Sequence, residues 1–162
     1  MEIEQVIFQP SGWVPNNPRL PVVVYRAALP DGWSSDFEAA FARNDWTGIW
    51  RDGVFDYQHY HVSTHEVLGI GRGRARLLIG GPDGRAIDVV KGDCLVLPAG
   101  TGHLNLGSSS DFQVVGAYPE ADEADIQTRA STSVMLETIA SLPIPKTDPL
   151  LGHCGALLEA WR

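Results

Sequence analysis

The sequence predicts an all-β protein, a sandwich or barrel of antiparallel strands with one short N-terminal helix and short C-terminal helices packed outside. Three observations support this fold class. Short apolar runs between residues 53 and 118 alternate with the separators GRGR, GPDGR and KGD, which are typical of tight hairpins. No helical pattern interrupts these runs, as expected for an antiparallel sheet. Helical spacing is confined to the flanking segments.

The N-terminal segment, residues 1 to 52, is expected to supply two strands and a helix. IEQVIF alternates apolar and polar side chains, and LPVVVYRAAL is a β-branched run that follows the rigid PNNPR. Ser35 stands three residues before Glu38, which is the spacing of a capping box. The following residues place one apolar stripe at helical spacing, namely Phe37, Ala40 and Phe41. The sequence therefore predicts a helix over residues 35 to 45 that packs against the sheet.

The barrel core, residues 53 to 118, contains the strand candidates GVFDYQHYH, HEVLGIG, RARLLIGG, AIDVV, DCLVLPAG, HLNLG and FQVVGAY. In residues 119 to 162, EADEADIQTRASTS is expected to be an exposed loop. VMLETIASLPIP and GALLEAW have short helical patterns. These pieces are too short to bury a core of their own, so they are expected to cover the barrel. Residues 1 to 162 are thus expected to form a single domain.

Composition and charge exclude several classes of partner. The formal net charge is −8, from 20 acidic and 12 basic side chains, which repels both nucleic acid and anionic membranes. The opening residues MEIEQVIFQP lack the basic segment of a secretory signal, so we expect a cytoplasmic protein. The two cysteines, Cys94 and Cys154, form no CxxC motif, which argues against a disulfide framework or a thiolate zinc site.

Potential metal ligands are concentrated in HYHVSTHE, residues 59 to 66, which contain three of the five histidines of the chain. On a strand, His59 and His61 would share one face roughly 7 Å apart, so both imidazoles can reach one ion. A bend at VST can return Glu66 toward them, and His103 follows a proline and glycine turn. Imidazole and carboxylate ligands together suit Mn, Fe, Co, Ni or Zn better than Ca or Mg.

Two segments around these residues resemble the motifs of the cupin superfamily. Residues 53 to 73 resemble the first motif, G-x5-H-x-H-x3-4-E-x6-G. Residues 92 to 107 resemble the second, G-x5-P-x-G-x2-H-x3-N, except that Gly107 stands in the place of the final Asn. The flanking segments PNNPRLPVVVY, VVGAYP and LPIPKTDPLLGHCGALLEAW are similar to the YjlB-like bacterial cupins.

The resemblance implies a jelly-roll β-barrel, also called a double-stranded β-helix, that holds one divalent transition metal, namely Fe, Mn, Ni, Co or Zn. The ligands carried over by position are His59, His61, Glu66 and His103. Such a site keeps one or two coordination positions open, as oxygenase or isomerase chemistry on a small organic molecule requires. Glu66 would then also take part in catalysis.

Several alternatives remain open at the level of the sequence. His65 rather than Glu66 could turn toward the site, and the same residues could form a polar core without metal. Tyr57 is a candidate catalytic residue or a packed side chain, and the expected substrate-lining residues are Phe55, Tyr57 and Asn105.

At the level of function, a non-catalytic cupin that binds or senses a metal or a small ligand is the alternative to an enzyme. A homodimer is expected, because the strands EIEQVIF or PVVVY could lie at exposed sheet edges and pair with a second copy.

Overall fold

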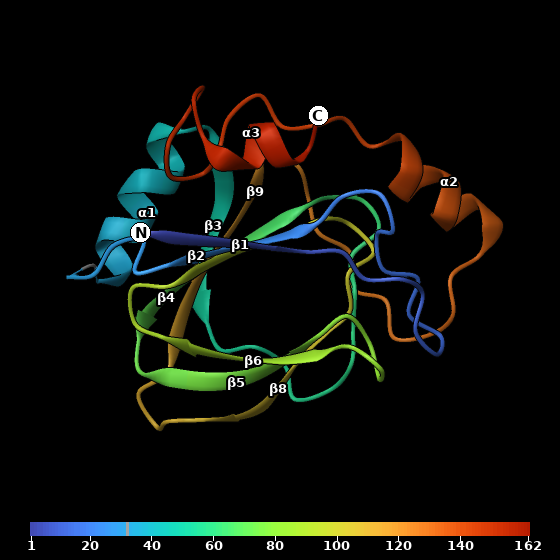
Figure 1. Ribbon diagram of the computed structural model, residues 1–162, viewed down its shortest axis with the longest axis horizontal. Coiled ribbons are helices and arrows are strands. Elements are labelled where there is room, and N and C mark those ends of the chain that lie inside the picture. Colours follow the sequence, from blue (N-terminus) through green and yellow to red (C-terminus); the bar gives the residue numbers. More distant parts are fainter. Residues whose placement is uncertain (32) are drawn as a thin grey trace.

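The computed structural model describes residues 1 to 31 and 33 to 162, which fold into two antiparallel sheets that face each other (Figure 1). One sheet has six strands in the order β1-β2-β7-β4-β9-β3, and the other has three in the order β6-β5-β8. In chain order the strands are β1 (Glu2–Val6), β2 (Val22–Arg26), β3 (Trp46–Asp52), β4 (Glu66–Arg72), β5 (Arg74–Ile79), β6 (Arg85–Val90), β7 (Cys94–Leu97), β8 (His103–Ser108) and β9 (Gln113–Pro119). The helices are α1 (Ser34–Arg43), α2 (Ser133–Ser141) and α3 (Ala156–Ala160).

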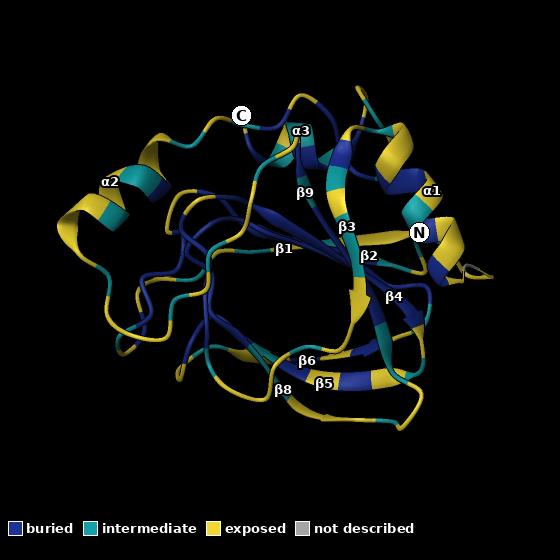
Figure 2. Cartoon of the chain, turned by 180° about the vertical axis from the view of Figure 1, so that it is seen from behind, coloured by how far each residue is buried: buried dark blue, intermediate teal, exposed yellow. Residues whose placement is uncertain are grey.

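Apolar side chains fill the space between the sheets, which explains the strand patterns. In β5, buried Ala75, Leu77 and Ile79 alternate with more exposed residues, as the banding of this strand shows (Figure 2). They pack against residues of the six-stranded sheet such as Leu68 and Ile70. The predicted all-β jelly-roll fold with its helices outside is confirmed, although the pairings in the described part of the chain form two sheets and not one closed sheet.

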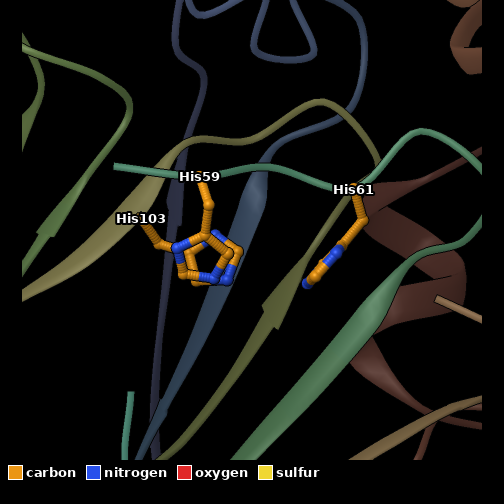
Figure 3. Close-up of side chains that lie close together, drawn as sticks. All are labelled: His59, His61 and His103. Atoms are coloured by element: carbon orange, nitrogen blue, oxygen red, sulfur yellow. The ribbon is translucent and has the colours of Figure 1, made fainter. Parts of the chain in front are cut away.

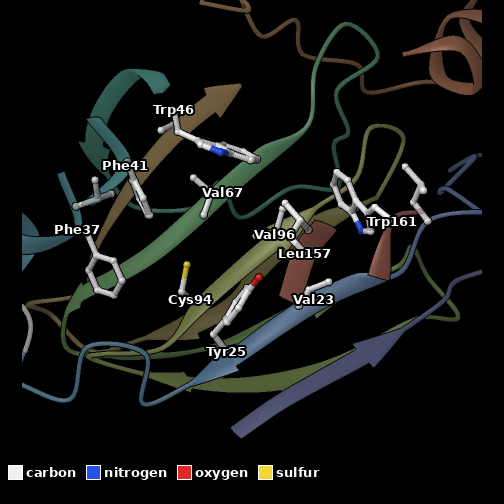
Figure 4. Packing of buried hydrophobic residues seen from close by; sticks show 13 residues of the cluster. Val23, Tyr25, Phe37, Phe41, Trp46, Val67, Cys94, Val96, Leu157 and Trp161 are labelled. Atoms are coloured by element: carbon white, nitrogen blue, oxygen red, sulfur yellow. The ribbon is translucent and has the colours of Figure 1, made fainter. Parts of the chain in front are cut away.

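The six-stranded sheet is covered on its other face by α1 and α3, so its central strands are buried on both sides (Figure 4). The side chains of Phe37, Phe41 and Trp161 pack there around Val67 and Val96. This double covering is why β4 and β7 read as nearly continuous apolar runs rather than as alternating ones.

Helix α1 begins one residue earlier and ends two residues earlier than predicted, at Ser34 and Arg43. The predicted capping box of Ser35 and Glu38 is wrong. The backbone nitrogen of Trp33 instead donates to Oδ2 of Asp36 at 2.8 Å, while the Glu38 carboxylate pairs with Arg51 on β3. The stripe of Phe37, Ala40 and Phe41 is buried, as the helical spacing indicates.

The segment between α1 and β4 differs most from the prediction. Strand β3 was not expected, because a register shift between Thr47 and Trp50, beside Gly48 at φ +64°, breaks its alternation. The predicted strand GVFDYQHYH is irregular instead. Two isolated bridges, from His59 to His103 and from Tyr60 to Gln127, join it to distant segments, and the carbonyl oxygens of Phe55 and His61 accept from the backbone nitrogens of Asn105 and Gly100.

The C-terminal segment is attached to the sheet by a buried carboxylate, Asp148. This group accepts a hydrogen bond from the Tyr25 hydroxyl at 2.5 Å and one from the backbone nitrogen of Leu157 at 3.1 Å. The indole nitrogen of Trp161 donates to the carbonyl of Pro21 at 2.8 Å. Specific polar contacts therefore hold α3 against the sheet that it was expected to cover. Within the described residues, no helix is long and apolar enough to cross a membrane.

Candidate metal centre

Three imidazoles converge between the sheets although they come from different parts of the chain (Figure 3). His59 and His61 lie on the irregular segment before β4, and His103 is the first residue of β8. One ring nitrogen of each histidine lies within 4.8 Å of the others, and all three residues are buried. Glu66, the first residue of β4, places Oε1 3.4 Å from Nε2 of His61 and 3.3 Å from Nε2 of His103.

Backbone carbonyls fix the orientation of each imidazole ring. Nδ1 of His59 lies 3.0 Å from the carbonyl oxygen of Tyr57, and Nδ1 of His103 lies 3.0 Å from that of Thr101. Nδ1 of His61 faces the carbonyl oxygen of Asp125. A carbonyl can only accept, so each Nδ1 carries the hydrogen, and Nε2 of the neutral ring keeps its lone pair. All three Nε2 atoms are therefore potential ligands.

The cluster has strongly perturbed charges because it is buried beside one carboxylate. Burial and the neighbouring His103 lower the pKa of His59 to about 3. Burial alone would also lower the pKa of His61, but the Glu66 carboxylate raises it to about 9. Burial would raise the pKa of Glu66, whereas His61 and His103 together hold it well below its usual range. The carboxylate thus attracts positive charge, either a proton on His61 or a cation.

A cavity of about 230 Å³ opens beside this cluster. Its wall combines aromatic and aliphatic side chains with the charged residues Arg51 and Asp52 and with the cluster itself, and the lining residues are Trp50, Arg51, Asp52, Gly53, Val54, Phe55, His59, His61, Glu66, Leu68, His103, Tyr118 and Ile126. The Tyr118 hydroxyl accepts a hydrogen bond from the indole nitrogen of Trp50 at 2.9 Å. Burial and the Glu66 carboxylate raise the pKa of Tyr118. This hydroxyl is therefore protonated and can donate to Glu66 or to a bound molecule.

A glycine determines where the Trp50 indole lies. Trp50 pairs with Gly116 across β3 and β9, and a Cβ atom on Gly116 would lie 2.0 Å from Cε2 of the indole. Only glycine leaves room for the ring to lie over this part of β9. The indole nitrogen consequently reaches Tyr118, two residues further along the same strand.

Comparison with known proteins then decides the family. No protein-family model matches the chain, but it is 40% identical over 162 residues to the uncharacterized protein YjlB of Bacillus subtilis (strain 168), covering 99% of this chain and 97% of YjlB. The chain belongs to the YjlB family.

Among the solved structures similar in fold to the YjlB-family chain are an 11S globulin and an acireductone dioxygenase. Procruciferin, an 11S globulin from Brassica napus, has a TM-score of 0.41 and 16% identity, over 70% of this chain and 28% of that one. Acireductone dioxygenase from Bacillus anthracis, with a cadmium ion in its active center, has a TM-score of 0.37 and 21% identity, over 59% and 60%.

In this YjlB-family chain, the expected lining residues separate into two groups. Phe55 lines the cavity, whereas Tyr57 and Asn105 are not among its lining residues. Tyr57 is 43% exposed, and its ring stacks on Phe55 at a centroid distance of 4.8 Å. The Asn105 amide donates to Oγ of Ser108 at 3.1 Å. Tyr57 departs from the expected position because residues 53 to 61 are irregular rather than a strand.

His65, the alternative to Glu66, lies away from the cluster. Its Nδ1 accepts a hydrogen bond from the backbone nitrogen of Ala99 at 2.9 Å, and Nε2 lies 3.3 Å from the carbonyl oxygen of Pro143. The ring meets Trp161 edge-on, and burial lowers the pKa of His65 to about 4. His65, directly before β4, thus packs against the C-terminal covering, while Glu66, the first residue of β4, faces the histidines.

Sequence reasoning did not identify Trp50, Tyr118 or Asp125 as parts of the site. Tyr118 stands in the predicted strand FQVVGAY, where an aromatic hydroxyl at the end of an apolar run was the only signal. Trp50 lies on the strand that was not predicted. Asp125 belongs to a loop that was expected to be merely exposed, yet its carbonyl holds His61.

Proposed function

We propose that His59, His61, Glu66 and His103 hold one divalent transition metal, and that the protein is an enzyme that acts on a small organic molecule in the adjoining cavity. The observation that carries the proposal is the convergence of three Nε2 atoms and one carboxylate oxygen at the cavity wall. Three nitrogens and one oxygen suit Fe, Mn, Ni, Co or Zn. A metal site that opens into an adjoining cavity is the arrangement expected of a metalloenzyme.

The donor set fits a cation on chemical grounds. The backbone carbonyls at Nδ1 leave the three Nε2 lone pairs available, which is the arrangement that metal-binding histidines generally show. The Glu66 carboxylate raises the pKa of His61 to about 9, so a positive charge is favoured here. A metal ion would supply that charge in place of the proton.

The cavity residues have separate tasks in this proposal. When bound, the metal supplies Lewis acidity or a redox centre. The apolar side chains of Phe55, Leu68 and Ile126 limit the access of water to the substrate. Tyr118, oriented by Trp50, donates a hydrogen bond to a substrate oxygen. Glu66 contributes as a ligand that keeps the metal in place rather than as a base, because its pKa lies well below its usual range. Tyr118 thereby takes the role that the sequence suggested for Tyr57.

The direct test is turnover by protein loaded with one metal at a time. Untagged, chelator-treated protein is loaded with Fe²⁺, Mn²⁺, Co²⁺, Ni²⁺ or Zn²⁺ and supplied with diketones, thiols and sugar acids. Oxygen uptake and product NMR then report oxygenation and isomerisation, respectively. We expect one metal per chain and turnover by at least one loaded form.

A matched pair of variants assigns any activity to the site. His103→Ala should abolish turnover, whereas His153→Ala, which removes an exposed histidine outside the cluster, should retain it. Metal uptake without turnover of any compound in the panel would contradict an enzyme and favour a binding protein.

The expected homodimer remains a prediction. PVVVY is not available as an edge, because β2 lies between β1 and β7, whereas β1 is the edge strand of its sheet. Small-angle scattering of the intact protein would give the oligomeric state.

A further inference from the structure

The acidic segment between β9 and α2 is bound tightly to the histidine segment. The Asp125 carboxylate accepts hydrogen bonds from the backbone nitrogen of Val62 at 2.9 Å and from that of Ser63 at 2.9 Å. It also accepts from Oγ of Ser63 at 2.7 Å and from the amide of Gln127 at 2.9 Å. Burial would raise the pKa of Asp125, but these donors lower it to about 2.

The same residue contacts His61 through its backbone. The carbonyl oxygen of Asp125 accepts from Nδ1 of His61, and an antiparallel bridge between Tyr60 and Gln127 continues the contact, with N to O distances of 3.1 and 2.9 Å. Residues 125 to 127 therefore run alongside residues 60 to 63. Between them, Ile126 lines the cavity.

His61 differs from the other two histidines in the origin of its partner. His59 and His103 bond to carbonyls two residues away in their own segments, those of Tyr57 and Thr101. The partner of His61 lies 64 residues away in sequence. The orientation of this one ring depends on whether a distant loop stays in place.

We infer that Asp125 is a positioning residue for the metal centre: its carboxylate anchors residues 62 and 63, and this anchoring keeps its own carbonyl at Nδ1 of His61. The inference rests on the proposed metal site. The loop that contains Asp125 thus orients a metal ligand in addition to connecting β9 to α2.

Metal affinity tests the inference without any need for a substrate. Zn²⁺ is titrated into chelator-treated protein in competition with a fluorescent zinc chelator of known affinity. Removal of a group that orients a metal ligand through a hydrogen bond typically weakens metal binding roughly 10- to 100-fold. We therefore expect Asp125→Ala to weaken Zn²⁺ binding by about that factor. Asp125→Asn keeps the shape but removes the charge and should lie between Asp125→Ala and wild type.

Glu123→Ala is the matched control, because it removes the same charge from an exposed position in the same loop. It should leave the Zn²⁺ affinity within about twofold of wild type, a much smaller change than the one expected for Asp125→Ala. NMR of the histidine Nδ1–H resonances gives a second readout. The His61 signal should broaden through solvent exchange in Asp125→Ala, while the His59 and His103 signals persist.

The possible failures are distinguishable. If wild-type protein binds no Zn²⁺, the metal site itself is wrong. If wild type binds Zn²⁺ and Asp125→Ala binds it equally well, or Glu123→Ala weakens it as much, the positioning role is overturned while the site stands. If Asp125→Ala does not fold, Asp125→Asn and Ser63→Ala decide, since each removes part of the same contacts. Unchanged affinity in both would also overturn the inference.

Discussion

His59 and His103 form an antiparallel backbone pair, in which each residue donates its N–H to the carbonyl oxygen of the other, at N to O distances of 3.3 and 3.0 Å. The pair joins the segment before β4 to the start of β8, and the two ring centroids lie 4.0 Å apart. Because these bonds involve the backbone and not the imidazoles, either side chain can be removed while the pair remains. Ligation and folding can therefore be tested separately.

His59→Ala is expected to weaken Zn²⁺ binding by at least about 100-fold, because one of the four proposed metal ligands is lost. Without metal, the free energy of unfolding of the variant should fall by only about 1 kcal/mol. This is the net contribution of the single hydrogen bond that the His59 ring makes, to the carbonyl oxygen of Tyr57. Isothermal calorimetry and urea unfolding measure the two quantities. Wild-type affinity in this variant would exclude His59 as a ligand.

Metal binding is expected to stabilise the folded protein. A ligand at 100 times its dissociation constant adds about 2.7 kcal/mol to the free energy of unfolding when it binds only the native state. The melting temperature should rise with added Zn²⁺ and fall back with a chelator, as followed by calorimetry. His103→Ala should show no rise. An equal rise in both proteins would indicate binding elsewhere on the surface.

The buried His65 predicts a loss of stability in acid. Its folded-state pKa is about 4 against an ordinary value of 6.5, so the unfolded chain takes up a proton that the folded chain resists. The contribution is fully present above pH 6.5 and is lost as pH falls toward 4, by about 2 kcal/mol between pH 7 and pH 5. Urea unfolding of metal-free protein at the two pH values measures this loss.

His65→Gln removes the titrating group and should show a correspondingly smaller drop between pH 7 and pH 5. The other buried histidines titrate in both proteins, so their contributions cancel in the difference. Equal drops in the two proteins would contradict the assignment of the effect to His65.

Gly116→Ala should disturb the cavity wall. The added Cβ atom would meet the Trp50 indole, and relief of such a clash costs about 1–3 kcal/mol of stability. The indole N–H resonance of Trp50 should shift as its bond to Tyr118 is lost. Gly107→Ala is the control, because a Cβ atom there meets nothing within 4 Å. Equal effects of the two substitutions would argue against a specific role of Gly116.

The sequence predicted the parts of the fold that have local signals. The resemblance to the two cupin motifs implied that His59, His61, Glu66 and His103 converge, and the structure brings these four side chains together. The missed elements depend on relations that no short segment contains. The position of Trp50 depends on a register shift in β3 and on a glycine in β9.

The contact of Asp125 with His61 is missed for a related reason. It depends on the path of a polar loop whose composition indicates only exposure. The predicted strand at residues 53 to 61 was wrong because hydrogen bonds to distant segments, rather than alternation of side chains, order that region.

The most direct test of the metal centre is anomalous diffraction from crystals of untagged protein grown with Zn²⁺ or Co²⁺. One strong peak is expected, about 2.0–2.2 Å from Nε2 of His59, His61 and His103 and from a carboxylate oxygen of Glu66. A peak only at other residues, or no peak at this position in crystals that contain ample metal, would contradict the proposed site.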